Sequence, residues 1–266
     1  MYDRYRRKII YLRISVTDRC NLRCTYCMPS EGVELLKHKD ILSYDEIIAV
    51  TKKAVELSVN KIRITGGEPL VRKGILYLIE KLAKIAGIQD FGMTSNGILL
   101  HKYAWDLKKS GLHRINISLD TLNPEKYKKI TRGGDISLVF KGIKAAKKAG
   151  LLPVKINCVI KKSLQEPDAL EVKDFCERNA LQVRFIRQMD LSTGEFWQVY
   201  GGEGGNCSKC NRLRLTANGF VKPCLFSNIG FSVRELGVET AIREAIDKKP
   251  RCGTANFINH FNNIGG

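Results

Sequence analysis

Short apolar runs alternate with longer amphipathic segments along the first 190 residues of the chain. The short runs are often rich in β-branched residues, which predicts strands, and the longer segments repeat their apolar residues at helical spacing. The strands are expected at 11–16, 61–65, 91–95, 114–119, 154–160 and 183–189. The helices are expected at 43–58, 72–86, 101–110, 136–149 and 167–179, with one more at 232–247.

Local signals mark the ends of several predicted helices. Ser43 precedes the first one and Glu46 follows three residues later, which is the pattern of a capping box. Gly111 and Gly150 directly follow two others, where a helix often ends in a glycine with left-handed backbone. The pattern therefore predicts bounds as well as element types.

Strands that alternate with helices predict an α/β fold with a parallel sheet. A curved six-stranded partial barrel and an open doubly wound sheet both fit, and in either fold function gathers at the carboxyl ends of the strands. A cysteine loop follows the first strand, GGEP the second, NG the third and LD the fourth. We therefore expect these motifs to converge on one site.

The chain has 266 residues and a formal net charge of +18. Such a charge suits nucleic acid or a phosphorylated small molecule, although lysine-rich helix faces such as KAAKKAG account for most of it. The sequence contains neither an aromatic-interleaved basic stretch nor an apolar run long enough to cross a membrane. Because MYDRYRRKII is unlike a secretory signal, we expect a cytoplasmic protein that binds neither membrane nor nucleic acid.

Nine cysteines argue for metal binding, because an odd number in a reducing compartment does not suit a disulfide framework. Cys20, Cys24 and Cys27 lie in one loop, CNLRCTYC. A structural zinc site usually has four protein ligands, so three thiolates leave one position open. They can hold three irons of a [4Fe–4S] cluster whose fourth iron binds an external molecule. The alternative is a zinc site completed by a remote residue.

A second group, Cys207, Cys210 and Cys224, lies in CSKCNRLRLTANGFVKPC and also lacks an obvious fourth ligand. A zinc ribbon and a second cluster with an open iron are both compatible with it. Arg212 and Arg214 lie between its cysteines, where guanidinium groups can meet an anionic or carbonyl-bearing ligand. The other cysteines are interpreted as small residues without a metal role, namely Cys158, Cys176 and Cys252.

CxxxCxxC with Tyr26 before its last cysteine resembles the signature of the radical S-adenosylmethionine (SAM) superfamily, and TGGEP at 65–69 matches its second motif. Members use one electron from a cluster to cleave SAM to methionine and a 5′-deoxyadenosyl radical. The paired cysteine groups, INISLDTLN, FIRQMD and Gly265–Gly266 further resemble the GTP 3′,8-cyclase family, over nearly the whole chain. These lyases convert GTP to (8S)-3′,8-cyclo-7,8-dihydroguanosine 5′-triphosphate, the first step of molybdenum-cofactor biosynthesis.

The resemblance implies two [4Fe–4S] clusters, SAM as cofactor, GTP as substrate and a reducing electron donor, and a homodimer is compatible with it. The SAM-cleaving cluster is expected on Cys20, Cys24 and Cys27, and the auxiliary cluster, which meets the guanine ring, on Cys207, Cys210 and Cys224. Positions that line SAM are Tyr26, Gly67, Ser118 and Met189. Positions that contact GTP are Arg13, Arg63, Thr94, Lys155, Arg212, Leu213 and Arg214. A catalytic role, as the radical takes the ribose H3′ and the carbon radical attacks guanine C8, is expected for Arg212, Arg214, Gly265 and Gly266.

Each matched residue also has a plainer interpretation. Arg13, Arg63 and Lys155 are compatible with outward surface positions, and Met189 with core packing. Two other functions are likewise compatible with the residues. One is another auxiliary-cluster radical SAM enzyme that acts on a peptide or other substrate, which GTP binding would discriminate. The other is a zinc-stapled basic nucleic-acid-binding protein, which iron analysis would discriminate.

Seventeen residues separate Met189 from Cys207, a few tens fewer than the family has there. Extended, they reach about 56–61 Å, enough to bring the two cysteine groups to one chamber. We predict a partial (β/α)6 TIM-like barrel with the SAM site at 1–190. A small C-terminal cluster-binding extension with the auxiliary cluster and substrate region follows at 191–266, and it should be more open or mobile than in relatives.

Overall fold

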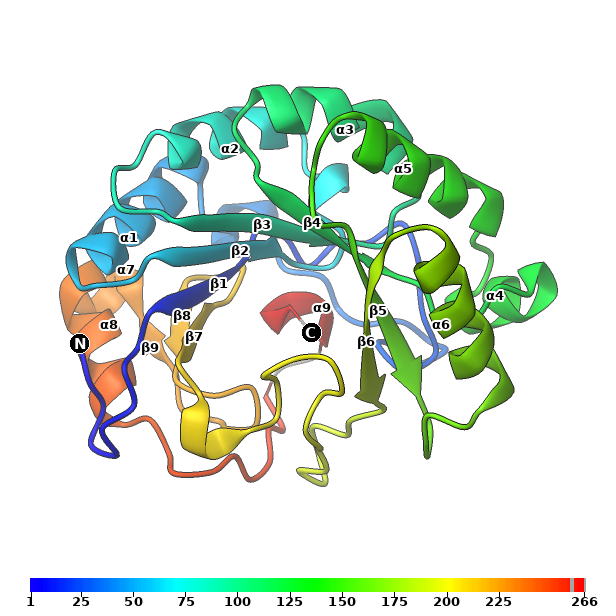
Figure 1. Ribbon diagram of the computed structural model, residues 1–266. Coiled ribbons are helices and arrows are strands. Elements are labelled where there is room, and N and C mark those ends of the chain that lie inside the picture. Colours follow the sequence, from blue (N-terminus) through cyan, green and yellow to red (C-terminus); the bar gives the residue numbers. More distant parts are fainter. Residues whose placement is uncertain (259–260, 266) are drawn as a thin grey trace.

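The computed structural model describes residues 1–258 and 261–265, which form a sheet of nine strands curved into a partial barrel (Figure 1). The strand order is β6-β5-β4-β3-β2-β1-β7-β8-β9. The first six strands are β1 (Tyr11–Ser15), β2 (Lys61–Thr65), β3 (Asp90–Ser95), β4 (Arg114–Ser118), β5 (Lys155–Ile160) and β6 (Gln182–Arg187). They pair in parallel, and β7 (Arg212–Leu215) is parallel to β1. Antiparallel β8 (Phe220–Lys222) and β9 (Phe231–Ser232) complete the edge.

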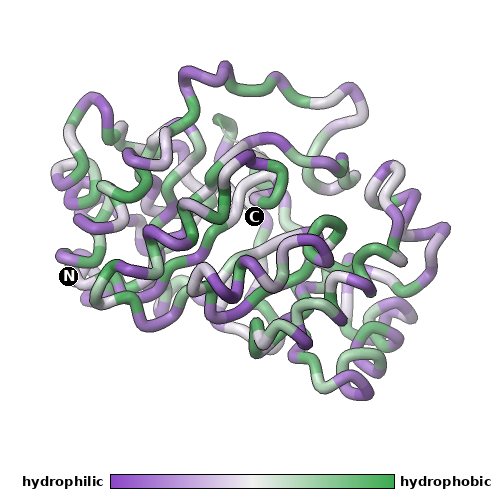
Figure 2. The backbone as a smooth tube through the Cα atoms, turned by 90° about the horizontal axis from the view of Figure 1, so that it is seen from above, coloured by the Kyte–Doolittle hydropathy of each residue, from purple (hydrophilic) through white to green (hydrophobic). Residues whose placement is uncertain are grey.

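Helices cover the outer face of this sheet (Figure 1). The chain forms α1 (Tyr44–Glu56), α2 (Ile75–Ala83), α3 (Leu100–Lys109), α4 (Pro124–Thr131), α5 (Ile136–Lys148) and α6 (Pro167–Arg178). The C-terminal part adds α7 (Val233–Leu236) and α8 (Val238–Asp247), which lie beside α1, and α9 (Phe261–Ile264), which lies inside the barrel (Figure 1). Hydrophobic and hydrophilic positions alternate along the outer helices (Figure 2), as expected for helices that bury one face.

The strands place apolar residues outward and polar residues inward. Ile14 and Ile64 are buried in the hydrophobic core beneath the helices. Their neighbours Arg13 and Arg63 line the interior, as does Asn116 on β4. Since side chains alternate between the faces of a strand, this two-residue period leaves a polar space inside the barrel instead of a packed core.

The predicted partial barrel is confirmed, as are all six strands and the five helices between them. Ser43 and Glu46 form the predicted capping box, each side chain accepting a hydrogen bond from the backbone N–H of the other. Gly111 and Gly150 have positive φ angles after α3 and α5. The local signals therefore marked these helix ends correctly.

Four details differ from the prediction. The helix expected at 232–247 is divided into α7 and α8 at Gly237, whose φ of +76° cannot continue a helix. β7 joins the barrel as a further parallel strand. α4 begins after Asn123, whose side chain accepts from Lys126 N. Residues 261–264 form α9, where no helix was predicted.

The connector, residues 190–206, crosses the open side of the barrel between β6 and β7 (Figure 1). It is bonded to the barrel, because Tyr200 and Phe185 exchange two backbone hydrogen bonds of 3.0 Å. Asp190 and Glu195 close a turn by a backbone hydrogen bond of 3.0 Å. A side chain at Gly194 would overlap the carbonyl of Thr254, so the connector also packs tightly on the chain that leads to α9.

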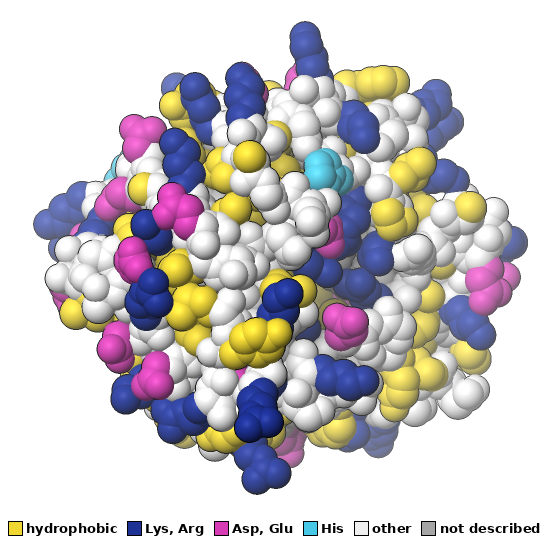
Figure 3. Space-filling view, turned by 60° about the vertical axis from the view of Figure 1, so that its left-hand side comes forward, with side chains coloured by type: hydrophobic (Ala, Val, Ile, Leu, Met, Phe, Trp, Pro, Cys, Tyr) yellow, Lys and Arg dark blue, Asp and Glu magenta, His cyan; other side chains and the backbone are white. Residues whose placement is uncertain are grey.

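Lys and Arg side chains are spread over the molecular face in Figure 3 among Asp and Glu. Exposed ion pairs along helices include Arg178–Asp174 and Lys84–Glu80, both at 2.5 Å. Such pairs agree with the interpretation of lysine-rich helix faces as solvated surface. Within the described residues, no helix is both long and apolar enough to cross a membrane.

Candidate active site

A cavity of about 600 Å³ lies inside the partial barrel, lined by strand residues and by the loops that follow the strands. Both cysteine groups face it. Cys20, Cys24 and Cys27 come from the loop after β1, and Cys207, Cys210 and Cys224 come from the chain on either side of β7 and β8. Residues from opposite ends of the sequence therefore share one chamber, as the connector length allowed.

The first cysteine group is shaped by a tight turn. The Cys24 carbonyl accepts from Cys27 N (2.9 Å) and Met28 N (3.1 Å), and Leu22 N donates to Cys20 Sγ (3.4 Å). Burial raises the pKa of the Cys20 thiol to about 11 and that of Cys24 to about 12. A buried thiolate needs a cationic partner. Three such thiols in one turn therefore fit a group that supplies iron.

The TGGEP motif is pressed against the start of this cysteine loop. Gly67 N donates to Thr17 O (2.7 Å), and Glu68 N donates to Arg19 O (2.9 Å). A side chain at Gly66 or Gly67 would overlap the backbone of Thr17 or Arg19. This close approach of two backbone segments requires glycine at both positions, independently of any contact with a ligand.

The Glu68 carboxylate ties the motif to β3. It is fully buried and accepts from Leu70 N (3.1 Å), Ser95 Oγ (2.9 Å) and Asn96 N (2.7 Å). Asn96 Nδ2 in turn lies 3.8 Å from Cys20 Sγ. The ends of β2 and β3 thus position one edge of the cysteine loop.

Tyr26 is held by the LD segment that follows β4. Its hydroxyl donates to Asp120 Oδ2 (2.7 Å), and Asp120 Oδ1 accepts from Val159 N (2.8 Å). Burial raises the pKa of Asp120 to about 6. The aromatic ring between the last two cysteines of the loop is therefore fixed by β4 and β5.

A buried cation, Lys249, lies beside the second cysteine group. Lys249 is 1% exposed, and its ammonium donates to Arg212 O (2.8 Å) and Pro223 O (2.5 Å). Burial alone would raise the pKa of Cys210, but Lys249 and Arg212 outweigh it and lower that pKa. Cys224 keeps a pKa raised by burial. Lys249 has no metal-site or strand signal in the sequence, which is why it was not predicted.

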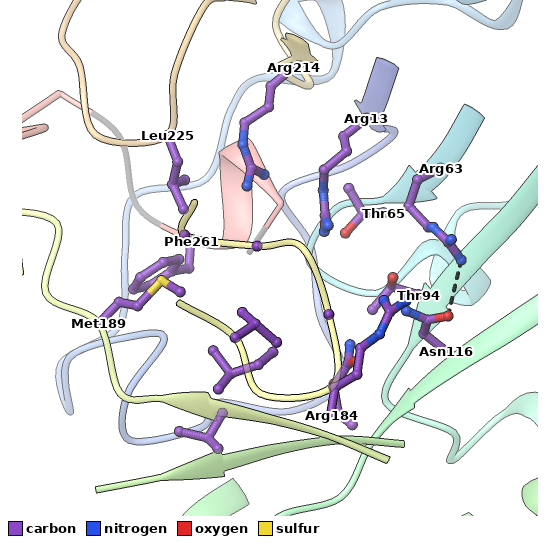
Figure 4. Close-up of a pocket in the computed structure, with 18 of the residues that line it drawn as sticks. Arg13, Arg63, Thr65, Thr94, Asn116, Arg184, Met189, Arg214, Leu225 and Phe261 are labelled. Atoms are coloured by element: carbon purple, nitrogen blue, oxygen red, sulfur yellow. Dashed lines mark hydrogen bonds between the residues drawn. The ribbon is translucent and has the colours of Figure 1, made fainter. Parts of the chain in front are cut away.

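Arginines from three neighbouring strands lie at the same level of the barrel (Figure 4). Arg13 is in register with Arg63 on one side and with Arg214 on the other. Gly92 is the partner of Arg63 on β3, and a side chain there would overlap the Arg63 guanidinium. Arg63 Nη1 donates to Asn116 Oδ1 (3.1 Å), the bond drawn in Figure 4.

Basic residues far outnumber acidic residues around the cavity. Among the described residues, the single acid that lines it is Glu203. The basic residues are Arg13, Lys61, Arg63, Arg114, Arg184, Arg187, Arg212 and Arg214. Burial and the neighbouring Arg13 and Arg212 lower the pKa of Arg214 to about 9. Such crowding favours a bound polyanion.

Several of these cations were not predicted from the sequence. Lys61 and Arg114 occupy the inward positions two residues before Arg63 and Asn116, so strand alternation could have found them. Arg184 is opposite Asn157 across β5 and β6, which requires the sheet pairing. Nε atoms of three arginines are buried and have no hydrogen-bond partner among the described residues, namely Arg63, Arg187 and Arg212. These Nε–H groups can donate hydrogen bonds to a ligand.

Most predicted site residues outside the cysteine groups line the cavity. They are Arg13, Tyr26, Arg63, Gly67, Thr94, Ser118, Met189, Arg212 and Arg214. Lys155 is outside that lining, although burial and the nearby Arg184 lower its pKa to about 8. The Leu213 side chain points into the hydrophobic core and is 1% exposed. Gly266 lies outside the described residues.

The C-terminal segment enters the cavity. Phe261 at the start of α9 lines it (Figure 4). Gly265 is buried, and its carbonyl accepts a hydrogen bond from Arg214 Nη1. A side chain at Gly265 would overlap Thr65 Cγ2, and its φ of +73° is in the left-handed region. Glycine is therefore required where the tail meets β2 and β7.

Comparison with known proteins agrees with this geometry. Residues 14–176 match the radical SAM superfamily. A GTP 3′,8-cyclase of Petrotoga mobilis is 43% identical over 280 residues, covering 88% of this chain and 87% of that protein. A GTP 3′,8-cyclase of Thermodesulfovibrio yellowstonii is 42% identical over 298 residues, covering 93% and 92%. The chain belongs to the GTP 3′,8-cyclase family of the radical SAM superfamily.

Solved structures support the fold of this family member. Native anSMEcpe with bound AdoMet has a TM-score of 0.62 at 15% identity, covering 91% of this chain and 81% of that one. Streptococcus suis SuiB has a TM-score of 0.60 at 18% identity, covering 82% and 60%. At these identities the likeness concerns the partial barrel alone. Membership of the radical SAM superfamily implies one [4Fe–4S] cluster and SAM.

This member of the cyclase family is shorter than its relatives. The alignment with the Petrotoga protein has 280 positions but uses only 88% of a 266-residue chain, so it contains gaps of a few tens of residues in this chain. That agrees with a missing segment. Its predicted place, the connector at 190–206, stays a prediction.

Proposed function

We propose that this chain converts GTP to (8S)-3′,8-cyclo-7,8-dihydroguanosine 5′-triphosphate, the first step of molybdenum-cofactor biosynthesis. The carrying observation is one cavity in which two three-cysteine groups face a shared set of arginines. Relatives that are named GTP 3′,8-cyclases, and that match about nine tenths of this chain, support the choice of substrate.

Cys20, Cys24 and Cys27 would hold the SAM-binding cluster, and Cys207, Cys210 and Cys224 the auxiliary cluster. The described residues contain no group of three His, Cys, Asp or Glu placed for a single metal ion. The fit rests on soft thiols, raised pKa values in the first group and Lys249 beside the second. When bound, the clusters and SAM supply an electron, a hydrogen-abstracting radical and an open iron for the guanine ring.

The first cysteine loop and the strand ends beside it would bind SAM. Tyr26, fixed by Asp120, would cover the cysteines and keep water away from them. Gly67 has no side chain, so the amino group of a ligand can approach its backbone beside the cysteine loop. Ser118 and Met189 line the same cavity, at the ends of β4 and β6.

The arginines that lie in register on β7, β1 and β2 would hold the triphosphate. Arg13, Arg63 and Arg214 project from adjacent strands in register, so they can bind one chain of phosphates together. Thr94 and Arg212 line the cavity beside them, and Lys155 would add positive potential from outside the lining. Leu213 would contribute only through its backbone, because its side chain is in the core.

The tail would orient this machinery. The Gly265 carbonyl accepts a hydrogen bond from Arg214, and Phe261, which lines the cavity, would shield part of it from solvent. Arg212 and Arg214 would stabilise charge on the substrate during cyclisation, with Gly265 and Gly266 as positioning residues. The division at residue 190 belongs to the same proposal, with SAM bound by 1–190 and the auxiliary cluster by 191–266. A reducing electron donor and a homodimer complete it.

Anaerobic metal analysis and SAM cleavage test the proposal together. Two clusters predict about eight irons per chain, and SAM cleavage should accelerate when GTP is added and yield the cyclised triphosphate. Zinc in place of iron would favour the nucleic-acid-binding alternative. SAM cleavage that ignores GTP in a protein with full iron would favour the alternative of a peptide or other substrate.

A further inference from the structure

A fourth thiol lies beside the second cysteine group. Cys252 Sγ is 3.2 Å from Cys207 Sγ. In the sequence Cys252 looks like Cys158 and Cys176, small residues apart from the metal motifs. Those two are buried in the hydrophobic core, whereas Cys252 is exposed at the second cysteine group. Cys252 therefore differs from them in its neighbours and in its access to solvent.

A buried arginine holds this contact in place. Arg7 Nη1 donates to Cys207 O (2.8 Å) and Arg251 O (3.1 Å), and its Nη2 donates to Pro250 O (2.7 Å). Asp3 pairs with the same guanidinium at 2.6 Å. Since one planar group bonds both backbone segments, the residue after Arg251 is fixed beside Cys207.

The same segment packs against the other cysteines of the group. Lys249 is buried, and its ammonium donates to the carbonyls of Arg212 and Pro223, which lie close in sequence to Cys210 and Cys224. A side chain at Gly253 would bring its Cβ within 3.1 Å of Cys224 Sγ. Thr254 N donates to Phe226 O (2.9 Å), just beyond Cys224. Residues 249–254 therefore pack against the second cysteine group from outside the cavity lining, and Cys252 belongs to this segment.

We propose that Cys252 supplies a fourth thiolate to the auxiliary cluster in the GTP-free protein, and that GTP displaces it. The inference rests on the proposed function, because it needs a cluster on Cys207, Cys210 and Cys224 with one iron left open. The two sulfurs now touch at 3.2 Å, longer than a disulfide of about 2.05 Å. To reach its own iron, Cys252 turns to another χ1 rotamer, which its exposure permits.

The exchange is a ligand substitution. One iron–sulfur bond breaks, one bond from the guanine to the same iron forms, and the released thiolate takes a proton from water. No electron moves. The thiolate keeps the open iron from water and oxidants until substrate arrives, and it competes with GTP for that position.

Competition has a measurable cost in affinity. The apparent Kd for GTP equals the intrinsic value divided by the fraction of protein whose iron is open. If Cys252 is bound in about nine tenths of the molecules, Cys252→Ala should bind GTP about tenfold more tightly. Cys176→Ala is the matched control, because it removes a thiol from the buried face of α6 and should leave GTP affinity unchanged.

Differential alkylation reads Cys252 directly and without activity. Trypsin cuts after Arg251 and releases 252–266, which contains Cys252 alone, and it releases 174–178, which contains Cys176 alone. Reconstituted protein is labelled anaerobically with iodoacetamide, then denatured and labelled with an isotopic form. We expect Cys252 to be protected in the iron-loaded protein, labelled when GTP is added, and labelled in the iron-free protein in either case.

The outcomes separate this inference from the proposed function. Equal labelling of Cys252 with and without iron overturns it, as does protection that GTP leaves unchanged or a Cys207–Cys252 disulfide found in the loaded protein. GTP affinity equal in the wild type and Cys252→Ala also overturns it. A protein that takes up about four irons instead of about eight contradicts the auxiliary cluster and thus the proposed function itself.

Discussion

At the scale of single residues, Gly92 decides where the Arg63 guanidinium lies. An added side chain would overlap that guanidinium and come within 3.2 Å of the Arg114 carbonyl. Arg63 is 2% exposed and bonded to Asn116, so it has little space to retreat. The absence of a side chain on β3 is therefore what leaves room for the Arg63 guanidinium inside the barrel.

Gly92→Ala should weaken GTP binding by about tenfold, because one displaced charge-assisted contact is worth about 1.5–3 kcal/mol, of which relaxation returns a part. Iron content and SAM binding should stay unchanged. Gly230→Ala is the matched control, since its added methyl meets only ordinary contacts of 3.5 Å or more. Isothermal calorimetry with GTP checks both. An unaltered affinity in Gly92→Ala would contradict the placement of phosphate at Arg63.

Substitution of a cysteine should abolish a different reaction in each of the two cysteine groups. Cys24→Ala removes a proposed ligand of the SAM-binding cluster and should abolish reductive cleavage of SAM. Cys210→Ala removes a ligand of the proposed auxiliary cluster, so slow uncoupled cleavage should persist while GTP cyclisation is lost. Chromatography of 5′-deoxyadenosine and of the cyclised nucleotide measures both reactions. Intact cyclisation in Cys210→Ala would exclude the assigned role of the second group.

At the scale of elements, α9 and Gly265 occupy part of the interior of the barrel. Gly265 contacts β2 through Thr65 and β7 through Arg214. Figure 1 shows this short helix inside the barrel, away from the outer helices. Its packing partners are therefore cavity residues, which links the order of the tail to the state of the active site.

Deletion of Gly265 and Gly266 should reduce turnover sharply while iron content stays unchanged, because Arg214 loses its carbonyl partner. Gly265→Ala should do the same through overlap with Thr65 Cγ2. Thr65→Ser removes that methyl group, so the double variant should recover part of the activity. Steady-state cyclisation assays compare the four proteins. Near-normal turnover after the deletion would show that the tail is dispensable.

The connector gives a prediction about order. Residues 190–206 are bonded to β6 through Tyr200 and border the cavity through 201–206. Bound GTP should contact the cavity-lining residues between 203 and 214, and these contacts should suppress local opening of the backbone. We expect amide hydrogen exchange between residues 190 and 230 to slow when GTP is added. Exchange that is equally fast with and without GTP would refute substrate-dependent ordering.

At the scale of the whole molecule, strand alternation and helix signals were enough to predict a parallel α/β sheet with the motifs at its strand ends. They fitted an open doubly wound sheet as well as the partial barrel that the structure has. β7 was missed because RLRL is only four residues long and its pairing partner, β1, lies 201 residues earlier, since Tyr11 pairs with Arg212. The tail helix has only four residues, FNNI, and its place depends on a cavity that exists only after folding. Lys249 and Cys252 reach the auxiliary site by packing across the chain, which local patterns do not encode.

The central claim is that GTP and SAM react in one chamber between the two cysteine groups. The most direct measurement follows deuterium from GTP labelled at ribose C3′ into 5′-deoxyadenosine, using the reconstituted enzyme under anaerobic conditions. We predict that 5′-deoxyadenosine acquires one deuterium as the cyclised triphosphate forms, and that Arg214→Ala, which retains both cysteine groups, loses most of this transfer. Unlabelled 5′-deoxyadenosine, produced at the same rate with or without GTP, would contradict the shared chamber.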